Sequence, residues 1–538
     1  MAGDVQRQID QTLQPPVQDF PPPPANPVAA PSENGPKVVI KRFAVEGSSL
    51  IPAAELAHQL DAYRDQPLSL PQLQASAQEL VGYYRERGWF VRVELPQQDV
   101  TDGTLRIVVV EGRLGNVVRE PGQTRANGDF VQSVVSHRLE AGQPYSLAQL
   151  ERGLLLANDL PGVSANGVLQ PGTKPGTSDL KLAVADQPLL AGQLSANTFG
   201  NRYTGRVQGG GSVAVRDLTG YGDQLSVQGM FSDHLDYEAV NYSFALNTDG
   251  LRANLGYSQL HYHLAKQFSD LDVRGEGQTM TVGLSYPLMR SSAKSLWLAV
   301  DYNHSRYQDS SFGESLHDRQ VDNVTVSAYG NRINSVAGTA LDWRVGMSQG
   351  HVGLDLDDDR DQDATGPRVA GTFTRLNLDA TRSQRLTSLW YTNLRVAGQW
   401  APDNLDGSQQ FSLGGPSGVR GYSVNEGQGD SGILAQAELH RLLAEAWVTG
   451  LDGYVFLDGG VVRQHHDTYA GWDTADTGRN TYGLAAAGVG VNWTLPGGFM
   501  ATALLAAPIG SNPAASDDKD QDGGHHGPRA WLGVTQKF

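Results

Sequence analysis

A cation and a carboxylate in two separate segments are the first residues of this chain that could do chemistry. Arg420 lies in the glycine-rich segment 411–422, and Asp458 lies inside the strand-like run 456–460. A guanidinium can donate charge-assisted hydrogen bonds to a carboxylate that faces it. The alternative is a surface arginine in a flexible loop, where an ion pair contributes little. The residue types and their spacing leave both interpretations open.

The glycines and aromatic residues around Arg420 and Asp458 are expected to shape a loop tip rather than to react. These residues are Phe411, Gly414, Gly415, Val419, Gly421 and Tyr422 in the first segment, and Phe456 and Gly460 in the second. A long glycine-rich loop needs contacts elsewhere in the molecule to hold one conformation, since glycine adds conformational freedom.

The motifs that resemble catalytic signatures lack their required context. Residues 427–432 match a GxGxxG pattern, but no strand-turn-helix unit surrounds them, which argues against dinucleotide binding. Their Gly-Asp-Ser-Gly part resembles a serine protease motif without matching His and Asp partners. We therefore expect no enzymatic activity and no cofactor.

Clusters of acidic residues and of histidines also fail as metal sites. Residues 518–523 imitate the start of a calcium loop, but Arg529 lies where that loop needs a glutamate. The acidic run 355–361 lacks the glycine as well. The pairs 465–466 and 525–526 are histidines without a third ligand at diagnostic spacing. We expect solvated external loops and no metal site, with adventitious cation binding that bridges to lipopolysaccharide as the weaker hypothesis.

The composition excludes several classes of protein. The 538 residues carry a formal net charge of −17, which argues against a nucleic-acid partner. There is no cysteine, which excludes thiol chemistry and is compatible with the bacterial periplasm and outer membrane. No run of about 18 apolar residues supports a transmembrane helix. A membrane barrel would escape that test, because only every second residue of its strands faces lipid.

From about residue 190 onward, apolar and polar residues alternate in segment after segment. Clear examples are residues 240–246, 279–286 and 296–303, where one face is apolar with Tyr and the other is polar or small. A soluble sandwich also alternates, but polar inward and apolar outward residues suit a wet lumen and a lipid exterior. We count sixteen candidate antiparallel strands between about 190 and 538.

The region before residue 188 divides into four parts. Residues 1–14 predict a short helix with Val5, Ile9 and Leu13 on one face. Residues 15–36 are proline-dense, which indicates either a disordered spacer or an extended tether. Residues 37–113 predict a β-α-α-β-β unit, and residues 114–187 repeat it, with helix start signals at Ser69, Pro71 and Ser146.

Four stretches together resemble one known family. The tetrad 419–422 and the run 456–460 resemble the loop-and-strand signature of BamA-like outer-membrane barrels. The runs 88–99 and 158–163 are similar to two-partner secretion transporters, the TpsB family typified by FhaC and ShlB. The resemblance extends over essentially the whole chain.

This resemblance implies an all-β transmembrane barrel of 16 antiparallel strands at 188–538, preceded by two α+β POTRA domains at 37–113 and 114–187. It also implies that helix 1–14 plugs the lumen and leaves it during transport, with 15–36 as its linker. The long loop 401–432 would fold into the lumen, where the family pattern pairs Arg420 with Asp458.

The resemblance further implies a translocation pore in the bacterial outer membrane, with the POTRA domains in the periplasm. Its cargo would be a TpsA-type exoprotein: a haemolysin, an adhesin or a contact-dependent inhibition toxin. Lipid, lipopolysaccharide and the barrel assembly machinery would be further partners, with Phe538 as the assembly signal. No signal peptide is visible at residues 1–4, so we expect a removed leader and a non-native Met1. The alternatives are a BamA-like insertase and, from other classes, an outer-membrane enzyme or a passive porin.

Overall fold

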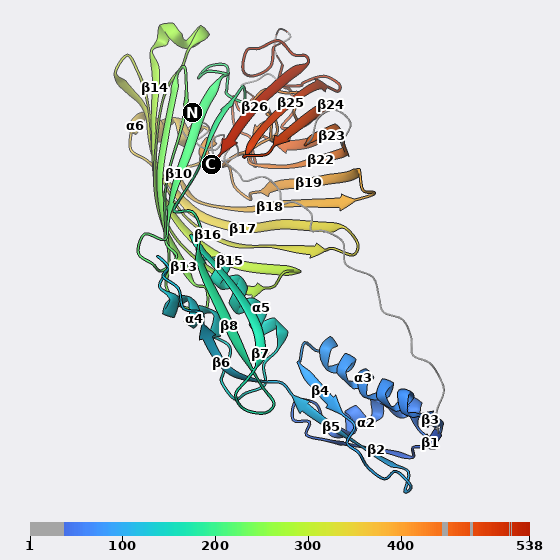
Figure 1. The fold of residues 1–538 in the computed structure, drawn as a ribbon. Helices are drawn as coiled ribbons and strands as arrows, with labels where there is room; N and C mark the ends of the chain where they lie inside the picture. Colours follow the sequence, from blue (N-terminus) through green and yellow to red (C-terminus); the bar gives the residue numbers. More distant parts are fainter. Residues whose placement is uncertain (1–36, 444–449, 474–476, 516, 518) are drawn as a thin grey trace.

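Two small α+β units precede a closed β-barrel (Figure 1). The structure is a computed structural model that describes residues 37–443, 450–473, 477–515, 517 and 519–538. The predicted plug helix with Val5, Ile9 and Leu13, and the proline-dense linker, lie outside the described residues. In Figure 1 the first unit, in blue, is the part farthest from the barrel.

The first α+β unit has a three-stranded sheet with helices packed on it. Its elements are β1 (Lys37–Val39), β2 (Arg42–Glu46), α2 (Ala53–Gln59), η1 (Asp61–Tyr63), β3 (Pro67–Ser69), α3 (Leu70–Glu86), β4 (Val91–Glu94) and β5 (Thr104–Glu111). In the sheet order β2-β5-β4, β2 pairs with β5 in parallel and β4 pairs with β5 antiparallel. Ser69 and Gln72 form a capping box at the start of α3, as the start signal predicted. Leu80, Tyr84 and Ile107 are fully buried between helix and sheet.

The second unit repeats this arrangement. Its elements are β6 (Arg113–Arg119), α4 (Gly128–Ser136), α5 (Leu147–Asn158), β7 (Val163–Pro171) and β8 (Thr177–Asp186), with sheet order β6-β8-β7. Ser146 caps α5 as predicted, through a capping box with Gln149. The two units join where the backbone amide of Leu147 donates to the carbonyl of Gly88 at 2.8 Å. None of the helices in the described ranges is both long and apolar enough to span a membrane.

The rest of the chain forms a closed barrel of 16 antiparallel strands, which confirms the predicted fold class. The strands are β9 (Leu190–Asn197), β10 (Gln208–Arg216), β11 (Gln224–Ser232), β12 (Leu235–Ala245), β13 (Arg252–His263), β14 (Val273–Arg290), β15 (Lys294–Ser311), β16 (Glu314–Asn334), β17 (Thr339–Leu354), β18 (Gly371–Arg385), β19 (Trp390–Trp400), β22 (Ser431–Leu442), β23 (Leu451–Arg463), β24 (Thr481–Leu495), β25 (Phe499–Pro508) and β26 (Arg529–Lys537). Each strand pairs with its neighbour in the sequence, and β26 closes the ring on β9 through Gly533–Lys537 and Gln193–Asn197.

The predicted alternation sorts side chains between the outside and the lumen. Val282 is 52% exposed and Val300 is 45% exposed on the outer face. Thr281, which adjoins Val282 in the sequence, lies directly cross-strand from Asn303 on the lumen side. Apolar side chains outside and polar ones inside are the pattern of a barrel in lipid.

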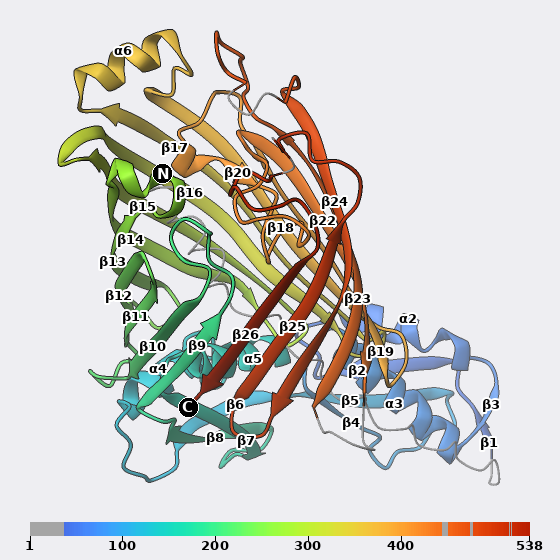
Figure 2. The ribbon, with the colours of Figure 1, turned by 90° about the horizontal axis from the view of Figure 1, so that it is seen from above.

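The long segment between β19 and β22, residues 401–430, folds into the barrel, and we call it the lumen loop. Figure 2 shows its β20 among the strands at one end of the ring. The loop contains η3 (Gly407–Gln409), β20 (Phe411–Ser412) and β21 (Gln428–Gly429), and β20 pairs with β21. Two other connections contain η2 (Lys266–Leu271) and α6 (Asp357–Thr365).

The second α+β unit is fixed to the barrel by charged contacts at the turn between β12 and β13. Asp249 in this turn accepts hydrogen bonds from Arg138 at 2.8 Å and from Arg152 at 3.2 Å. Close by, Arg290 of β14 donates to both oxygens of Asp159, at 2.8 and 2.7 Å. A bidentate geometry of this kind fixes orientation as well as distance. The second unit therefore has a defined position at the barrel end.

Candidate functional site: the lumen loop and its ion pairs

The structure brings Arg420 and Asp458 together inside the barrel. Nε of Arg420 donates to Oδ2 of Asp458 at 2.8 Å, and Nη2 donates to Oδ1 at 2.6 Å. The backbone amide of Arg420 donates to the same carboxylate at 3.1 Å. Arg420 is 4% exposed and Asp458 is 1% exposed. Buried charges are tolerated only when paired and hydrogen-bonded, and this pair meets both conditions.

Three further contacts complete the surroundings of Arg420. Its Nη1 donates to Oε1 of Glu438 on β22 at 2.5 Å. The guanidinium lies over the ring of Phe456, 3.6 Å from the ring centroid, in cation–π geometry. Trp531 of β26 donates from its indole nitrogen to the carbonyl of Arg420 at 2.9 Å. The loop tip therefore contacts β22, β23 and β26 at once.

A chain of polar groups continues from Glu438 along β22 and β23. His440 contacts Glu438 through Nε2 at 3.0 Å and Asp452 through Nδ1 at 2.9 Å. Tyr391 of β19 donates its hydroxyl to Asp452 at 2.7 Å. The imidazole of His440 is stacked between the rings of Tyr391 and Tyr454, at 4.4 and 4.7 Å between centroids. The fixed imidazole of His440 in turn orients the carboxylate of Glu438, which binds Arg420.

A second group of side chains holds the residues just before the arginine. Arg395 of β19 donates to the carbonyl of Ser417 at 2.9 Å and to Asp379 of β18 at 2.7 Å. Gln436 of β22 donates to the carbonyl of Gly418 at 2.9 Å. The tip is therefore held through its backbone as well as through the Arg420 side chain.

Two glycines are required because the loop approaches the wall closely. A Cβ atom on Gly421 would lie 2.7 Å from Cβ of Ala486 and 2.9 Å from the backbone nitrogen of Pro508. A Cβ on Gly460 would lie 2.4 Å from a methyl carbon of Leu413. Real Cβ atoms need more space than this, so only glycine lets the loop pack here.

The other predicted loop residues form the hydrophobic side of the site. Val419 and Tyr422 are fully buried in one cluster, with Phe411 packed against it. Gly414 forms an isolated bridge with Val419, and Gly415 has a φ of +112°, which favours glycine. Phe538 lies apart from the site: it is 63% exposed, and its backbone pairs with Gly192 of β9.

Two carboxylates tie the base of the lumen loop to other external connections. Glu426 accepts hydrogen bonds from the side chain of Asn512 at 2.7 Å and from the backbone of Gln521 at 2.9 Å. Asp430 accepts from the backbone amides of Leu405 at 3.1 Å and His466 at 2.7 Å. Because both carboxylates are fully buried, they link the loop structurally to the segments after β23 and β25.

Sequence reasoning missed Glu438, His440 and Asp452. Their positions did contain a signal, because Glu438 and His440 recur at period two on β22 and therefore share the lumen face with Gln436. Asp452 likewise lies on the same face of β23 as Asp458. Polar residues at alternating positions within otherwise apolar strands were the pattern that would have identified them.

The prediction that the acidic segments are solvated was wrong for Asp359, Asp520 and Asp522, which are buried, whereas Asp355, Asp357 and Asp361 are exposed. Asp359 lies in α6, is 6% exposed, and accepts a hydrogen bond from the backbone of Asp318. Asp520 is 3% exposed and pairs with Arg529 at 2.6 Å. The density of acidic residues suggested exposure to solvent, but Arg529 compensates the charge of Asp520, and the backbone amide of Asp318 binds Asp359. The described residues contain no group of three or more His, Cys, Asp or Glu placed to hold a metal ion.

Two family models match this chain. The model described as haemolysin secretion/activation protein ShlB/FhaC/HecB matches residues 176–493. The model of the ShlB-type POTRA domain matches residues 38–112.

Curated relatives and solved structures are consistent with those matches. The heme/hemopexin transporter protein HuxB of Haemophilus influenzae strain 86-028NP is 26% identical over 90% of this chain and 84% of its own length. The outer membrane transporter CdiB of Escherichia coli O6:K15:H31 is 24% identical over 82% of this chain and 76% of its own. The structure of CdiB from Escherichia coli matches with a TM-score of 0.74 at 22% identity, covering 99% of this chain and 96% of that one. BamA from Haemophilus ducreyi, lacking POTRA domains 1–3, matches with a TM-score of 0.55 at 13% identity, covering 93% and 100%.

Proposed function

Because this chain belongs to the haemolysin secretion/activation family ShlB/FhaC/HecB, we propose that it is the outer-membrane pore of a two-partner secretion system. Such a pore exports a large exoprotein from the periplasm to the cell surface. The observation that carries the proposal is a closed barrel whose lumen contains a loop held by Arg420 and whose end bears two α+β units. No nucleotide is needed, since folding of the exported chain outside the cell supplies a driving force.

The two α+β units would capture the unfolded exoprotein as POTRA domains in the periplasm. Strands β2 and β4 are the edges of one sheet, and β6 and β7 are the edges of the other. An extended segment can add to such an edge through backbone hydrogen bonds, with side-chain pockets giving specificity. Val168 of β7 is 64% exposed and offers an apolar contact at one of these edges.

The lumen loop would be the fixed inner part of the pore. We propose Arg420 and Asp458 as its anchor, with Glu438 sharing the guanidinium. Residues 1–14 would act as the plug that closes the remaining lumen at rest. The apolar outer face would contact lipid and lipopolysaccharide, and Phe538 would be read by the barrel assembly machinery.

A deletion experiment separates secretion from the insertase alternative. Surface export of the large exoprotein encoded beside this gene is compared with and without the gene, and the levels of unrelated outer-membrane barrels are measured in parallel. Loss of export with unchanged barrel levels supports the secretion pore. Normal export with depleted barrels would instead assign the chain to barrel assembly.

A further inference from the structure

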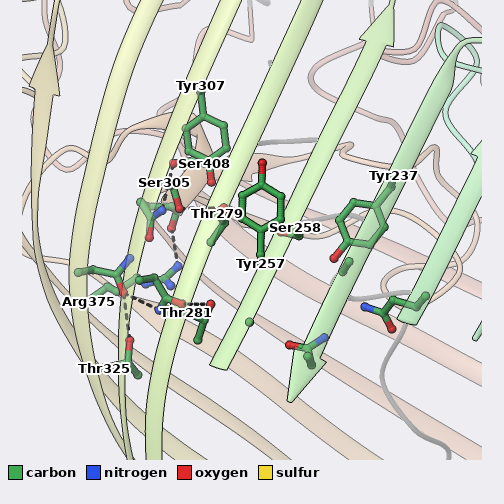
Figure 3. Close-up of a pocket in the computed structure, with 17 residues that line it drawn as sticks. Tyr237, Tyr257, Ser258, Thr279, Thr281, Ser305, Tyr307, Thr325, Arg375 and Ser408 are labelled. Carbon is green, nitrogen blue, oxygen red and sulfur yellow. Dashed lines mark hydrogen bonds between the residues drawn. The ribbon is translucent and has the colours of Figure 1, made fainter. Parts of the chain in front are cut away.

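A cavity of about 380 Å³ lies in the lumen between the lumen loop and the wall formed mainly by β12 to β16 (Figure 3). Hydroxyl and carboxamide side chains dominate its wall: Ser258, Thr279, Thr281, Asn303, Ser305 and Asn323. The lumen loop contributes Ser408 and Gln409 to the same lining. Arg375 is the one fully charged side chain in the lining, and it donates to the carbonyl of Gln409 at 3.3 Å.

The strand register arranges these side chains in rows across the barrel wall. One row runs through Asn241, Gly256, Thr281, Asn303 and Asn323, which are direct cross-strand partners on five successive strands. A second row, two residues away along each strand, contains Ser258, Thr279 and Ser305. We call the two rows together the neutral wall.

Hydrogen bonds within the neutral wall leave part of its polar capacity for another molecule. Thr281 donates to Asn303 at 2.8 Å, Asn303 donates to Asn323 at 3.3 Å, and Thr279 and Ser305 share a bond of 3.0 Å. A carboxamide has two donor hydrogens and an acceptor oxygen with two lone pairs, so one bond to each neighbour does not use all of them. The side chains are held in place and still offer donors and acceptors to the lumen.

Charged residues on β18, β19, β22 and β23 hold the loop. Arg420 is bound to Asp458 and Glu438, and Arg395 is bound to Asp379 and to the loop backbone. The wall around β18 to β23 is therefore occupied by the loop, whereas the neutral wall faces the cavity. A polypeptide moving through the barrel would meet the neutral wall.

The spacing of the rows suits an extended polypeptide. Two residues along a strand correspond to about 6.6 to 6.8 Å, which is also the repeat of side chains on one face of an extended chain. A neutral polar side chain can exchange water for these hydroxyls and amides at little cost, because the net free energy of each hydrogen bond is only about 1 kcal/mol. Arg375 is the one charged side chain in the lining, so a charged side chain elsewhere along the neutral wall would lose hydration without gaining a partner of opposite charge.

We propose that the neutral wall is the track along which the transported polypeptide passes, in extended form, and that it favours segments with uncharged polar side chains. This inference rests on the proposed secretion function and specifies the kind of segment that the lumen accepts. Weak hydrogen bonds in repeated rows would guide such a chain without trapping it.

Photocrosslinking on the purified full-length protein tests the track directly. A benzophenone side chain is placed at Asn303, or at the outward-facing Val282 as control, and is offered synthetic peptides of Gly-Asn-Ser, Gly-Asp-Ser or Gly-Lys-Ser repeats. Peptides of about 15 residues, which extend over about 50 Å, are long enough to span the wall. We expect the Gly-Asn-Ser peptide to crosslink at position 303 about threefold to tenfold more than either charged peptide, which corresponds to about one hydrogen bond. Position 282 should give no peptide adduct.

Matched substitutions then locate the interaction. Thr279→Val with Thr281→Val removes two hydroxyls of the wall at nearly constant volume and should lower the yield at position 303 severalfold. Thr502→Val, which removes a lumen hydroxyl bonded to Asn492 on another part of the barrel, should leave it unchanged. Three results would each overturn the proposal. They are equal yields for the three peptides, an unaffected yield in the double variant, and crosslinks from position 303 to residues 1–36 of the chain itself. Because synthetic peptides need no export, failure of the secretion function would appear separately, in the deletion experiment.

Discussion

Arg420 and Asp458 form a bidentate ion pair in which the backbone amide of the same arginine binds the same carboxylate. The side chain and the backbone of the loop tip are thereby fixed by one group on β23. Phe456, two residues before Asp458, lies under the guanidinium. The short strand motif therefore supplies both the counter-charge and the aromatic platform.

Removing the guanidinium should destabilise the loop strongly. Arg420→Ala leaves the buried carboxylate of Asp458 without its cation, which costs about 3 to 5 kcal/mol for a broken buried pair. Thermal unfolding of the barrel in detergent and protease cleavage of the lumen loop measure the effect. Arg420→Lys should fall between wild type and alanine, because a lysine cannot reproduce the bidentate geometry. A lysine variant as stable as wild type would show that charge alone holds the loop.

The two carboxylates that receive Arg420 should not be equivalent. The Asp458 side chain is 0% exposed and makes the bidentate contact, whereas Glu438 is 21% exposed and also contacts His440. We expect Asp458→Asn to lower the unfolding temperature more than Glu438→Gln, with both measured in the same detergent. The reverse order would place the main anchor on β22.

A single added methyl group tests the close packing of the loop tip. Gly421→Ala would force a Cβ to within 2.7 Å of Ala486, and overpacking of this kind costs about 1 to 3 kcal/mol. Gly459→Ala is the matched control, since its Cβ would have only the carbonyl oxygen of Leu484 nearby, at 3.9 Å. Chemical unfolding should separate the two variants, and equal losses would contradict the packing argument.

The stability of the junction between the second α+β unit and the barrel should not change near neutral pH and should fall only at acidic pH. Burial alone would raise the pKa of Asp249, but hydrogen bonds from Arg138, Tyr286 and Arg152 outweigh it and hold that pKa below its ordinary value. The stabilisation is therefore complete above the unfolded-state pKa of about 3.9 and is lost as the pH falls through the lowered folded-state pKa. Protease accessibility of the junction, followed from pH 7 downward, measures this loss.

The Asp249→Asn variant is the control for that titration. It should weaken the junction at neutral pH by about 1 to 3 kcal/mol, because Arg138 and Arg152 lose their charged acceptor. Its accessibility should then change less with acid than that of the wild type. An identical acid dependence in both proteins would assign the effect to other carboxylates.

Truncation of the N-terminal segment tests the plug. Deleting residues 1–30 should raise the single-channel conductance in a planar bilayer, because the segment proposed to close the lumen is gone. Full-length protein in the same membrane is the control. Unchanged conductance would refute the plug role.

The sequence predicted the parts of the fold that depend on local patterns. Period-two alternation identified the barrel strands, and Ser69 and Ser146 marked the helix starts. The pairing of Arg420 with Asp458 was expected from the resemblance of their two motifs to a known family, since residue types and spacing alone left it open. Pairings between residues far apart in the sequence, such as Glu426 with Asn512 and Asp359 with the backbone of Asp318, had no such local signal. Buried acidic residues such as Asp359 were therefore misassigned to solvent.

Export measured at matched barrel levels tests the central claim most directly. Cells with wild-type protein, Arg420→Ala or Arg420→Lys are compared for surface export of the large exoprotein encoded next to the gene. We predict export with the wild type, partial export with lysine and loss with alanine, while all three barrels reach the outer membrane. Full export by the alanine variant would contradict a secretion pore that depends on the Arg420–Asp458 pair.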